Sequence, residues 1–287
     1  MPLSCQNHKM LVLGAGGKVG RMLAQFWRRN PPEGLRPLYQ SSGVKRDGYL
    51  TWQADGDVSA LPKAETIVAL WGRREGDRQS MQVNVALGLR ALEVASELGA
   101  NRLLLASSSA VYTGTGLGRH AEGDMLVVPG GAYGASKLEM ERAVLARSGL
   151  ERGPAVSMLR LANVIGADSL FGNLQPGGEV VLDRFASGGG PMRSYLTVDD
   201  LAHVLEALAT CPQAALPPIV NVAGSHALAM ADLVEQAGGR VAWQAAPPAA
   251  LERIQMDTTL LQQITGPLVQ SSDPGLAIAS WRRERQD

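Results

Sequence analysis

A short apolar run that leads into three serines, followed by a tyrosine and a lysine, constrains this chain most. Residues Leu103 to Ala106 are long enough for one buried parallel strand, and residues 107–109 are all serine. Tyr133 and Lys137 follow at a spacing of four, so in a helix they share one face. The stretch therefore predicts a strand that ends in hydroxyl groups and a helix that carries a phenol beside an amine.

These side chains suit acid/base chemistry. An ammonium group beside a phenol favours the phenolate, so Lys137 should lower the pKa of Tyr133 from about 10 towards working pH. Ser108, at the carboxyl end of the strand, can hydrogen-bond the oxygen whose proton the tyrosine moves. A serine, a tyrosine and a lysine so arranged can interconvert an alcohol and a ketone if a hydride carrier binds nearby.

The N-terminal segment predicts a site for that carrier. A short apolar strand runs into glycines spaced G-x-x-G-x-x-G, and a helix is expected from about Lys18 to Arg29. This spacing departs from the G-x-G-x-x-G fingerprint, but the glycines still allow a tight turn and a close approach of backbone to a pyrophosphate at the helix N-terminus. A plain glycine-rich turn is the alternative. The predicted cofactor contacts are Gly14, Gly17, Lys18, Val19 and Gly20.

The second expected strand, Leu35 to Gln40, bears on which dinucleotide binds. An NAD site usually has an acidic residue at the end of this strand, where it holds the ribose 2′-hydroxyl. Here Gln40 and Ser41 occupy the strand end, and Lys45 and Arg46 follow closely. Hydroxyls and cations suit a 2′-phosphate better, so the expected cofactor is NAD(P), with NADP(H) favoured. The alternative is that Lys45 and Arg46 form a solvated loop.

Two further strands are expected before residue 71. The run from Tyr49 to Ala54 leads to Asp55 and Asp57, one of which could accept a hydrogen bond from an adenine amino group, although Asp-Gly-Asp also forms turns. The run from Thr66 to Leu70 is followed by Trp71 and Gly72, where a small residue would let the backbone lie under a cofactor and the large indole argues against it. An exposed loop is expected for residues 73–78.

Strands and helices alternate through residue 165. Residues 83–98 have helical periodicity with Gly99 as the C-cap, and Asn84 lies near the start of this helix, either as a cap or under the site. Residues 156–161 form another strand, which Asn163 follows. This order predicts an α/β fold with a Rossmann-type, doubly wound parallel sheet. Ligands of such sheets bind beyond the carboxyl ends of the strands, where the polar residues converge.

The texture of the sequence changes after Gly166. Residues 172–190 are rich in glycine and proline. Residues 193–200 are expected to open a helix that runs to about Thr210, with Asp199 and Asp200 at the positive end of its dipole, and a strand at 219–222 and a helix at 228–236 follow. We expect a dinucleotide-binding domain over residues 1–166 and a small substrate-binding lobe over residues 167–287. A return of the chain to the sheet near residues 193–223 is left open.

Composition excludes several classes of function. Lysine and arginine together number 27, as do aspartate and glutamate, so the net charge is zero, and without a basic run nucleic acid is not expected as a partner. No apolar stretch approaches the roughly 18 residues of a membrane span, and the N-terminus lacks the apolar region of a signal peptide. Cys5 and Cys211 make neither a disulfide framework nor a metal cluster. We expect a soluble, cytoplasmic protein without a metal.

Four motifs together resemble the extended short-chain dehydrogenase/reductases, and within them the NAD-dependent epimerase/dehydratase family that acts on nucleotide sugars. The resemblance covers roughly residues 10–225. The motifs are Gly14-x-x-Gly17-x-x-Gly20, the run from Ser107 to Tyr112, Tyr133-x-x-x-Lys137, and Arg160-x-x-Asn163-Val164-x-Gly166.

The resemblance implies a role for each matching residue. Ser108 would be the catalytic serine, Tyr133 the general acid/base, and Lys137 the residue that binds the nicotinamide ribose and lowers the pKa of Tyr133. Asn163 would touch the substrate, and Arg193 would contact its diphosphate. The expected cofactor-binding set includes Leu70, Trp71, Gly72, Asn84, Ser107, Tyr133 and Lys137, and the expected substrate-binding set is Ser108, Ser109, Asn163 and Arg193.

The departures from the family pattern narrow the reaction. The sugar dehydratases have an acidic pair beside the catalytic residue, whereas Ser109 and Ala110 follow Ser108 here, so dehydration is disfavoured. The short C-terminal lobe is nearer to that of the family's sugar reductases. The expected reaction is 4-epimerisation or keto-sugar reduction of a nucleotide-activated sugar. Reduction of another carbonyl compound, or a non-catalytic NADP sensor that kept the fold, are the alternatives.

A homodimer is a further expectation from the resemblance. Many relatives pair through the helix that follows Asn84 and the helix that carries Tyr133. In this chain Leu87, Leu138 and Met140 could serve either such a face or the core.

Overall fold

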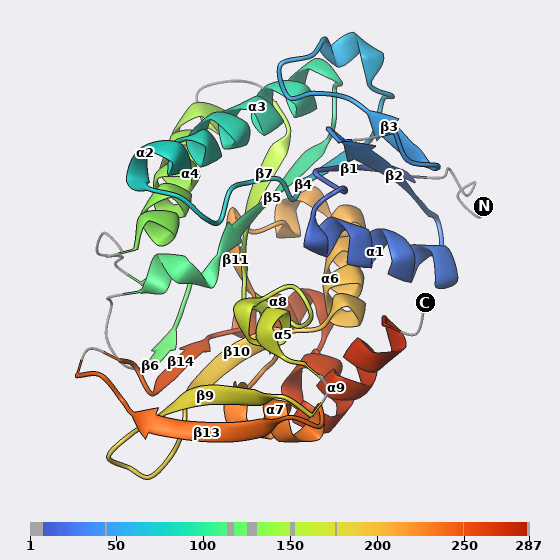
Figure 1. Cartoon of the computed structure of the whole chain (residues 1–287). Helices are drawn as coiled ribbons and strands as arrows, with labels where there is room; N and C mark the ends of the chain where they lie inside the picture. The colour runs from blue at the N-terminus through green and yellow to red at the C-terminus, as the bar shows by residue number, and fades with distance from the viewer. Residues whose placement is uncertain are drawn as a thin grey trace.

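Seven parallel strands form the central sheet of the part of the chain that the computed structural model describes, in the order β11-β7-β5-β4-β1-β2-β3 (Figure 1). The described residues are 8–43, 45–113, 118–124, 131–149, 153–175, 177–248 and 250–285, so Cys5 lies outside them. The strands are β1 His8–Leu13, β2 Leu35–Ser41, β3 Tyr49–Thr51, β4 Thr66–Ala69, β5 Arg102–Ser108, β7 Ala155–Leu161 and β11 Ile219–Val222. The predicted α/β class and doubly wound sheet are confirmed.

The central strands are apolar on both faces, and helices cover both. In β1, Met10 and Val12 pack with one hydrophobic cluster, whereas Leu11 and Leu13 pack with another, and all four side chains are fully buried. Successive residues of a strand point to opposite faces, so a continuous apolar run predicts a sheet covered on both sides.

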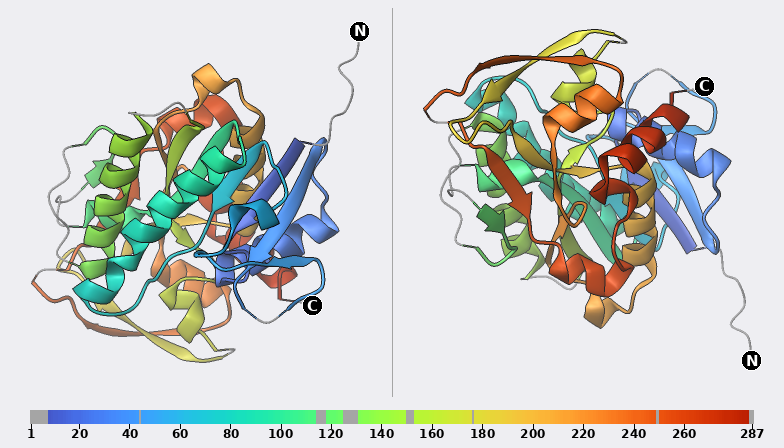
Figure 2. Two further views of the ribbon diagram at one scale, coloured as in Figure 1. Left: turned by 90° about the horizontal axis from the view of Figure 1, so that it is seen from above. Right: turned by 90° about the horizontal axis from the view of Figure 1, so that it is seen from below.

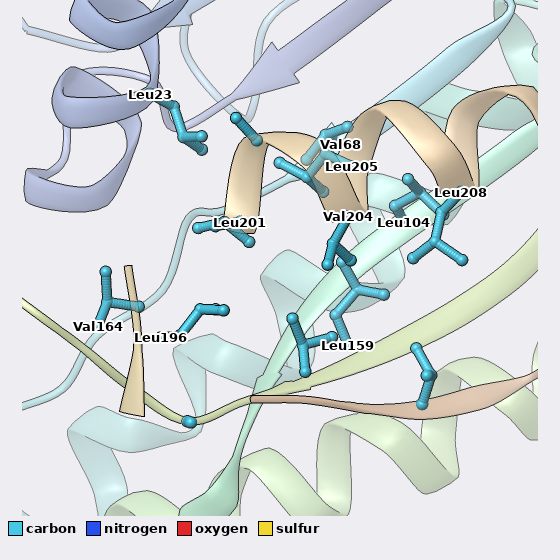
Figure 3. Packing of buried hydrophobic residues seen from close by; sticks show 14 of the residues in the cluster. Leu23, Val68, Leu104, Leu159, Val164, Leu196, Leu201, Val204, Leu205 and Leu208 are labelled. Carbon is cyan, nitrogen blue, oxygen red and sulfur yellow. The ribbon is translucent and has the colours of Figure 1, made fainter. Parts of the chain in front are cut away.

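Helices α1 Lys18–Arg29 and α6 Val198–Thr210 pack on one face, and α3 Val83–Glu97 and α4 Ala132–Ser148 pack on the other (Figure 2). Leucines of α6 meet Leu23 of α1 and the sheet residues Val68, Leu104 and Leu159 (Figure 3). The expected bounds of α1 are confirmed. Helix α3 ends next to Gly99, whose φ of 68° is the left-handed conformation that favours glycine at a helix end.

The burial of Leu138 and Met140 shows whether these two residues of α4 could form a dimer face. Leu138 and Met140 are 5% and 1% exposed and lie in the two clusters that sandwich the sheet, so they serve the core. Leu87 is half-buried.

A smaller sheet lies below the carboxyl ends of the central strands (Figure 1). Its order is β12-β10-β14-β6, with β8 paired to β10, and a separate parallel ribbon joins β9 to β13. The strands are β6 Gly118–His120, β8 Asn163–Val164, β9 Glu179–Arg184, β10 Met192–Leu196, β12 Ala227–Ala229, β13 Arg240–Ala245 and β14 Arg253–Met256. The helices around them are α5 Ser169–Asn173, α7 Met230–Gln236, α8 Thr259–Thr265 and α9 Pro274–Arg283, and α2 Arg78–Met81 precedes α3.

The lobe has its own core, in which the rings of Phe171 and Trp281 meet edge to face with centroids 4.9 Å apart. The chain does not pass into this lobe once and stay there. Helix α6 and strand β11 follow Gly166 in sequence but pack in the central layers. The division at Gly166 remains a prediction. The chain does return to the central sheet within residues 193–223, because α6 packs on this sheet and β11 joins its edge.

No helix in the described ranges is both long and apolar enough to cross a membrane. Within the same ranges, no three histidine, cysteine, aspartate or glutamate side chains are grouped so that they could hold a metal ion.

Candidate active site

A cavity of about 530 Å³ opens at the carboxyl ends of β1, β4, β5 and β7. Residues of β10 and β14 from the smaller sheet close its other side, among them Arg193, Ile254 and Met256. Doubly wound sheets bind their ligands in this position, where strand order reverses between β1 and β4.

The glycine turn between β1 and α1 is built for close approach. A Cβ on Gly14, whose φ is 78°, would lie 2.7 Å from the backbone nitrogen of Trp71, and a Cβ on Gly20 would lie 2.5 Å from the Cα of Ala15. Gly17 precedes α1 without a side-chain cap, so the first amides of the helix stay open to an anion. Of the predicted contacts, Gly14, Gly17, Lys18, Val19 and Gly20 all line the cavity. These residues fit a dinucleotide pyrophosphate.

Ser108, Tyr133 and Lys137 line the same cavity. Ser108 ends β5 and accepts a hydrogen bond from the amide of Ala110 at 3.2 Å. Tyr133 and Lys137 lie in the first two turns of α4, and the Lys137 ammonium donates to the carbonyl of Ala106 on β5 at 2.8 Å. Strand β5 and helix α4 therefore bring together the three side chains that the sequence placed in one acid/base unit.

The electrostatics of Tyr133 differ from the simple expectation. Burial raises the pKa of this phenol, while a hydrogen bond with Ser108 and the positive charge of Arg74 lower it, and the net direction is upward. The Lys137 ammonium donates to the Ala106 carbonyl, and burial lowers the pKa of Lys137 to about 8. Of the two groups that lower the pKa of Tyr133, the hydroxyl of Ser108 has the larger effect.

Asn84 lies under the site and does not cap its helix. Its side chain is 1% exposed, accepts from the amide of Arg73 at 2.7 Å, and donates to the Arg73 carbonyl at 3.0 Å and to Ser136 at 2.9 Å. It does not line the cavity itself, but it fixes the backbone next to Gly72. A Cβ on Gly72 would lie 3.1 Å from the Asn84 amide oxygen and 3.3 Å from the Lys137 nitrogen.

The end of β4 forms the floor of the cavity through Leu70, Trp71 and Gly72. The indole of Trp71 stacks on Trp52 with ring centroids 6.3 Å apart, which turns much of its bulk towards the hydrophobic layer under α3. Trp71 thus packs with the hydrophobic layer under α3 and also lines the cavity.

Besides Asn84, four of the predicted cofactor residues do not line the cavity, namely Gln40, Ser41, Asp55 and Asp57. The buried Gln40 amide accepts from the Gly14 backbone and donates to the Trp52 carbonyl, so it fastens the glycine turn to the segment after β3. Asp57 is exposed and accepts a hydrogen bond from the Ser59 amide at 2.9 Å. This contact agrees with the turn-forming role that was the alternative to an adenine contact.

The two family-derived substrate residues have different surroundings. Asn163 lines the cavity on β8, which pairs with β10. Arg193 also lines it, but its guanidinium donates to the carbonyls of Met192, Leu251 and Glu252. Arg193 thus ties β10 to the segment before β14, and these bonds compete with the expected contact to a diphosphate. Ser107 and Ser109 line the cavity as well.

Two charged residues of the cavity were missed from the sequence. Arg74 is exposed, as its loop was expected to be, but it lines the cavity and donates to the Ala167 carbonyl at 3.1 Å. Asp168 also lines the cavity; it caps α5 by accepting from Phe171, and burial raises its pKa to about 6. An Asp-Ser pair at a helix start signals the cap, but no local pattern signals that Arg74 and Asp168 line the same cavity as Tyr133.

The fold and this arrangement define the class: a Rossmann-type protein of the extended short-chain dehydrogenase/reductases. The model of the NAD dependent epimerase/dehydratase family matches residues 10–223, and the chain belongs to this family. The resemblance drawn from the four motifs is confirmed. No curated protein sequence matches the chain.

Several solved structures are similar to this one over nearly the whole chain. They include an NAD-dependent NDP-hexosamine 5,6-dehydratase, TunA, involved in tunicamycin biosynthesis (TM-score 0.77, 19% identity, covering 96% of this chain and 98% of that one). MoeE5 in complex with UDP-glucuronic acid and NAD has a TM-score of 0.74 at 22% identity, covering 96% and 99%. UDP-N-acetylglucosamine 4-epimerase from Bacillus cereus has a TM-score of 0.75 at 18% identity, covering 95% and 97%. At these identities the likeness shows the fold alone.

Proposed function

We propose that this protein is an NAD(P)-dependent epimerase or reductase of a nucleotide-activated sugar. The observation that carries the proposal is that Ser108, Tyr133 and Lys137 line one cavity together with the glycine turn at the start of α1. The family supports a dinucleotide cofactor, and several structural neighbours are described as bound to, or acting on, UDP-sugars.

Each residue has one task in this proposal. Tyr133 transfers the proton of the substrate hydroxyl, and Ser108 orients that hydroxyl and the phenol. Lys137 holds the nicotinamide ribose with its ammonium, and the glycine turn and the amides of α1 hold the pyrophosphate. The bound dinucleotide supplies the hydride chemistry, and the protein contributes position and electrostatics. Dehydration is disfavoured because Ser109 and Ala110 stand where dehydratases have acids.

The substitution Tyr133→Phe tests the catalytic assignment. Removing the hydroxyl should lower turnover at least about 100-fold and leave cofactor affinity nearly unchanged, since the ring and its packing stay. A panel of nucleotide sugars that differ in both nucleotide and sugar is offered with NAD or NADPH, and products are followed by NMR, with Tyr39→Phe on β2 as the matched control. Retained turnover in Tyr133→Phe would refute the assignment, and no turnover of any nucleotide sugar of the panel by the wild type would refute the substrate class.

NADP(H) is the proposed cofactor. Strand β2 ends in Gln40 and Ser41, so it offers no carboxylate to a ribose 2′-hydroxyl. Gln40 is turned inwards and Ser41 is buried, whereas Lys45 and Arg46, which follow in the sequence, are exposed. Dissociation constants for NADP and NAD, measured by titration calorimetry, should favour NADP at least about tenfold. A clear preference for NAD would contradict this part of the proposal, and NAD released on denaturing the purified protein would point to an epimerase that keeps its cofactor.

A further inference from the structure

A buried carboxylate lies behind the catalytic residues. Glu141 is on α4, one helical turn after Lys137, and is 2% exposed. Its carboxylate accepts hydrogen bonds from the hydroxyl of Ser107 on β5 and from the guanidinium of Arg160 on β7, with the shortest Arg160 distance at 2.8 Å. Three neighbouring elements therefore fix one anion at a depth where an uncompensated charge would be costly.

The surroundings of Lys137 leave that anion as its charged neighbour. The ammonium donates to the Ala106 carbonyl, and the other atoms close to it are neutral groups of Gly72, Asn84 and Met140. Among the described residues, Glu141 is the charged group that acts on the Lys137 ammonium: burial lowers the pKa of Lys137 to about 8, and the Glu141 charge opposes that fall.

Arg160 faces Glu141 from the opposite side. It also donates to the Tyr112 hydroxyl at 2.9 Å and stacks over that ring, so its position does not depend on Glu141 alone. The Arg160 charge attenuates the field of the carboxylate, but Glu141 is one turn from Lys137 on the same helix, whereas Arg160 lies on β7. Removing the Glu141 charge would leave two buried cations, Lys137 and Arg160, without the carboxylate that lies close to both.

We propose that Glu141 is a positioning residue that keeps Lys137 protonated and held at β5 at neutral pH. The inference rests on the proposed function, in which the Lys137 ammonium holds the cofactor ribose. The competing interpretation is a purely structural role, in which the ion pair of Glu141 and Arg160 joins α4 to β7 and has no effect on the charge of Lys137.

Competitive labelling separates the two roles without a substrate. Limiting acetic anhydride is applied to the full-length protein across a pH series, and mass spectrometry compares acetylation of Lys137 with that of the exposed Lys63. The midpoint for Lys137 should lie near pH 8 in the wild type. In Glu141→Gln it should fall by about one pH unit or more. Glu139→Gln, which removes an exposed charge from the same helix, is the matched control and should leave the midpoint unchanged.

Two further variants keep the inference testable if Glu141→Gln does not fold. Glu141→Asp retains the charge, so its Lys137 midpoint should stay near the wild-type value. The double variant Glu141→Gln/Arg160→Gln replaces the ion pair with neutral amides, and its midpoint should also fall. A midpoint equal to the wild-type value in the single or double glutamine variant would overturn the inference. Because labelling needs no substrate, failure of the Tyr133 proposal would be recognised separately.

Discussion

Asp168 is a carboxyl group held where its ionised form is unfavourable. It is 6% exposed in the cavity wall, and burial raises its pKa from 3.8 to about 6, although the Phe171 amide and the charge of Arg74 pull the other way. A carboxyl whose pKa is raised on folding stabilises the folded state below its unfolded pKa, and that contribution is lost as pH rises through the folded pKa. The contribution of Asp168 to the free energy of unfolding should therefore decrease as the pH rises from about 4 to about 6, and it should stay at this lower value above pH 6.

The substitution Asp168→Asn should raise the melting temperature at pH 7 and have little effect below pH 4. Asparagine caps helices as well as aspartate does, so the cap to α5 should survive while the cost of the buried charge, at most about 3 kcal/mol, is removed. Asp57→Asn is the control of opposite sign, because hydrogen bonds from Ser59 lower the pKa of that exposed cap. A destabilised Asp168→Asn protein at pH 7 would show that its charge is used by a partner such as Arg74.

At the candidate site, side chains whose direction depends on local periodicity could be predicted from the sequence, and side chains whose direction depends on distant partners could not. Ser108, Tyr133 and Lys137 were predictable because strand and helix periodicity fix where such side chains must point. The inward turn of Gln40 was not, since it depends on the Gly14 amide and the Trp52 carbonyl, which lie on separate segments. Arg193 was assigned by analogy, and its carbonyl partners near residue 252 are far away in the sequence.

At the scale of elements, α3 and α4 touch through a glycine. A Cβ on Gly88 would lie 2.5 Å from the Cγ of Met140 and 3.1 Å from the Cγ2 of Val144, and both residues are fully buried. The two helices can therefore approach this closely only because one of them lacks a side chain at the crossing. The same contact fixes α4, which carries Tyr133 and Lys137, against the sheet.

Gly88→Val should destabilise the protein by about 1–3 kcal/mol because the helices must separate or Met140 must leave its packed position. Ala86→Val, at an exposed position of the same helix, loses helix propensity without touching the crossing and should cost well under 1 kcal/mol, whereas Gly88→Val gains propensity, so a larger loss there reports the crossing. Urea unfolding of both variants measures the difference. Equal stability of the two would mean that α4 can shift freely over α3, contrary to the packing described.

Long periodic elements were predictable, whereas short ones in the C-terminal lobe were not. The strands and helices of the first 165 residues show clear apolar patterns, and α1 was placed to the residue. Strands β9, β13 and β14 gave no usable pattern, because their pairing partners are distant and their faces are only partly buried. Residues 193–196 were expected to open the helix that runs to about Thr210, but they pair with β8, β12 and β14 as strand β10, and the helix begins at Val198. The helix expected from Leu228 begins at Met230, since residues 227–229 pair with β10.

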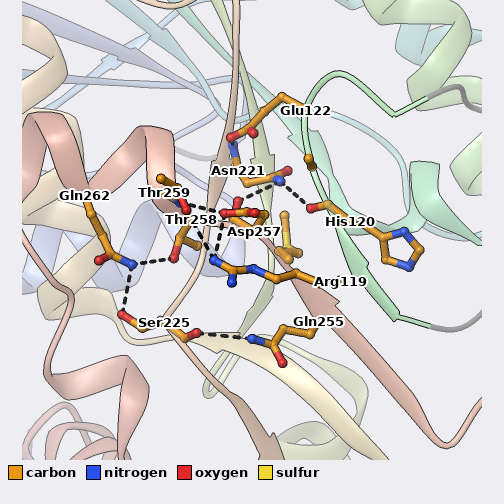
Figure 4. Close-up of polar contacts among 12 residues, drawn as sticks. Arg119, His120, Glu122, Asn221, Ser225, Gln255, Asp257, Thr258, Thr259 and Gln262 are labelled. Carbon is orange, nitrogen blue, oxygen red and sulfur yellow. Dashed lines mark hydrogen bonds and ion pairs between the residues drawn. The ribbon is translucent and has the colours of Figure 1, made fainter.

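At the scale of the whole molecule, a chain of polar contacts joins the two sheets. Tyr112 donates to the side chain of Asn221 on β11, and Asn221 donates to the carbonyls of His120 on β6 and Asp257 after β14 (Figure 4). Arg119 meets the Asp257 carboxylate at 2.8 Å. Because Arg160 also donates to Tyr112, helix α4 is linked through Glu141 to the smaller sheet.

The smaller sheet takes its strands from three separate stretches, namely β6, β8 with β10, and β12 with β14, and α6 and β11 return to the central layers between the last two. A lobe assembled in this way is not one continuous segment of the chain that could be exchanged as a unit. Recombination at a single junction cannot graft it onto a relative, because a junction before β11 divides the central sheet and a junction after β11 divides the lobe itself. New substrate preferences in this lineage would then arise by replacing individual wall residues and by lengthening loops, with the architecture inherited whole.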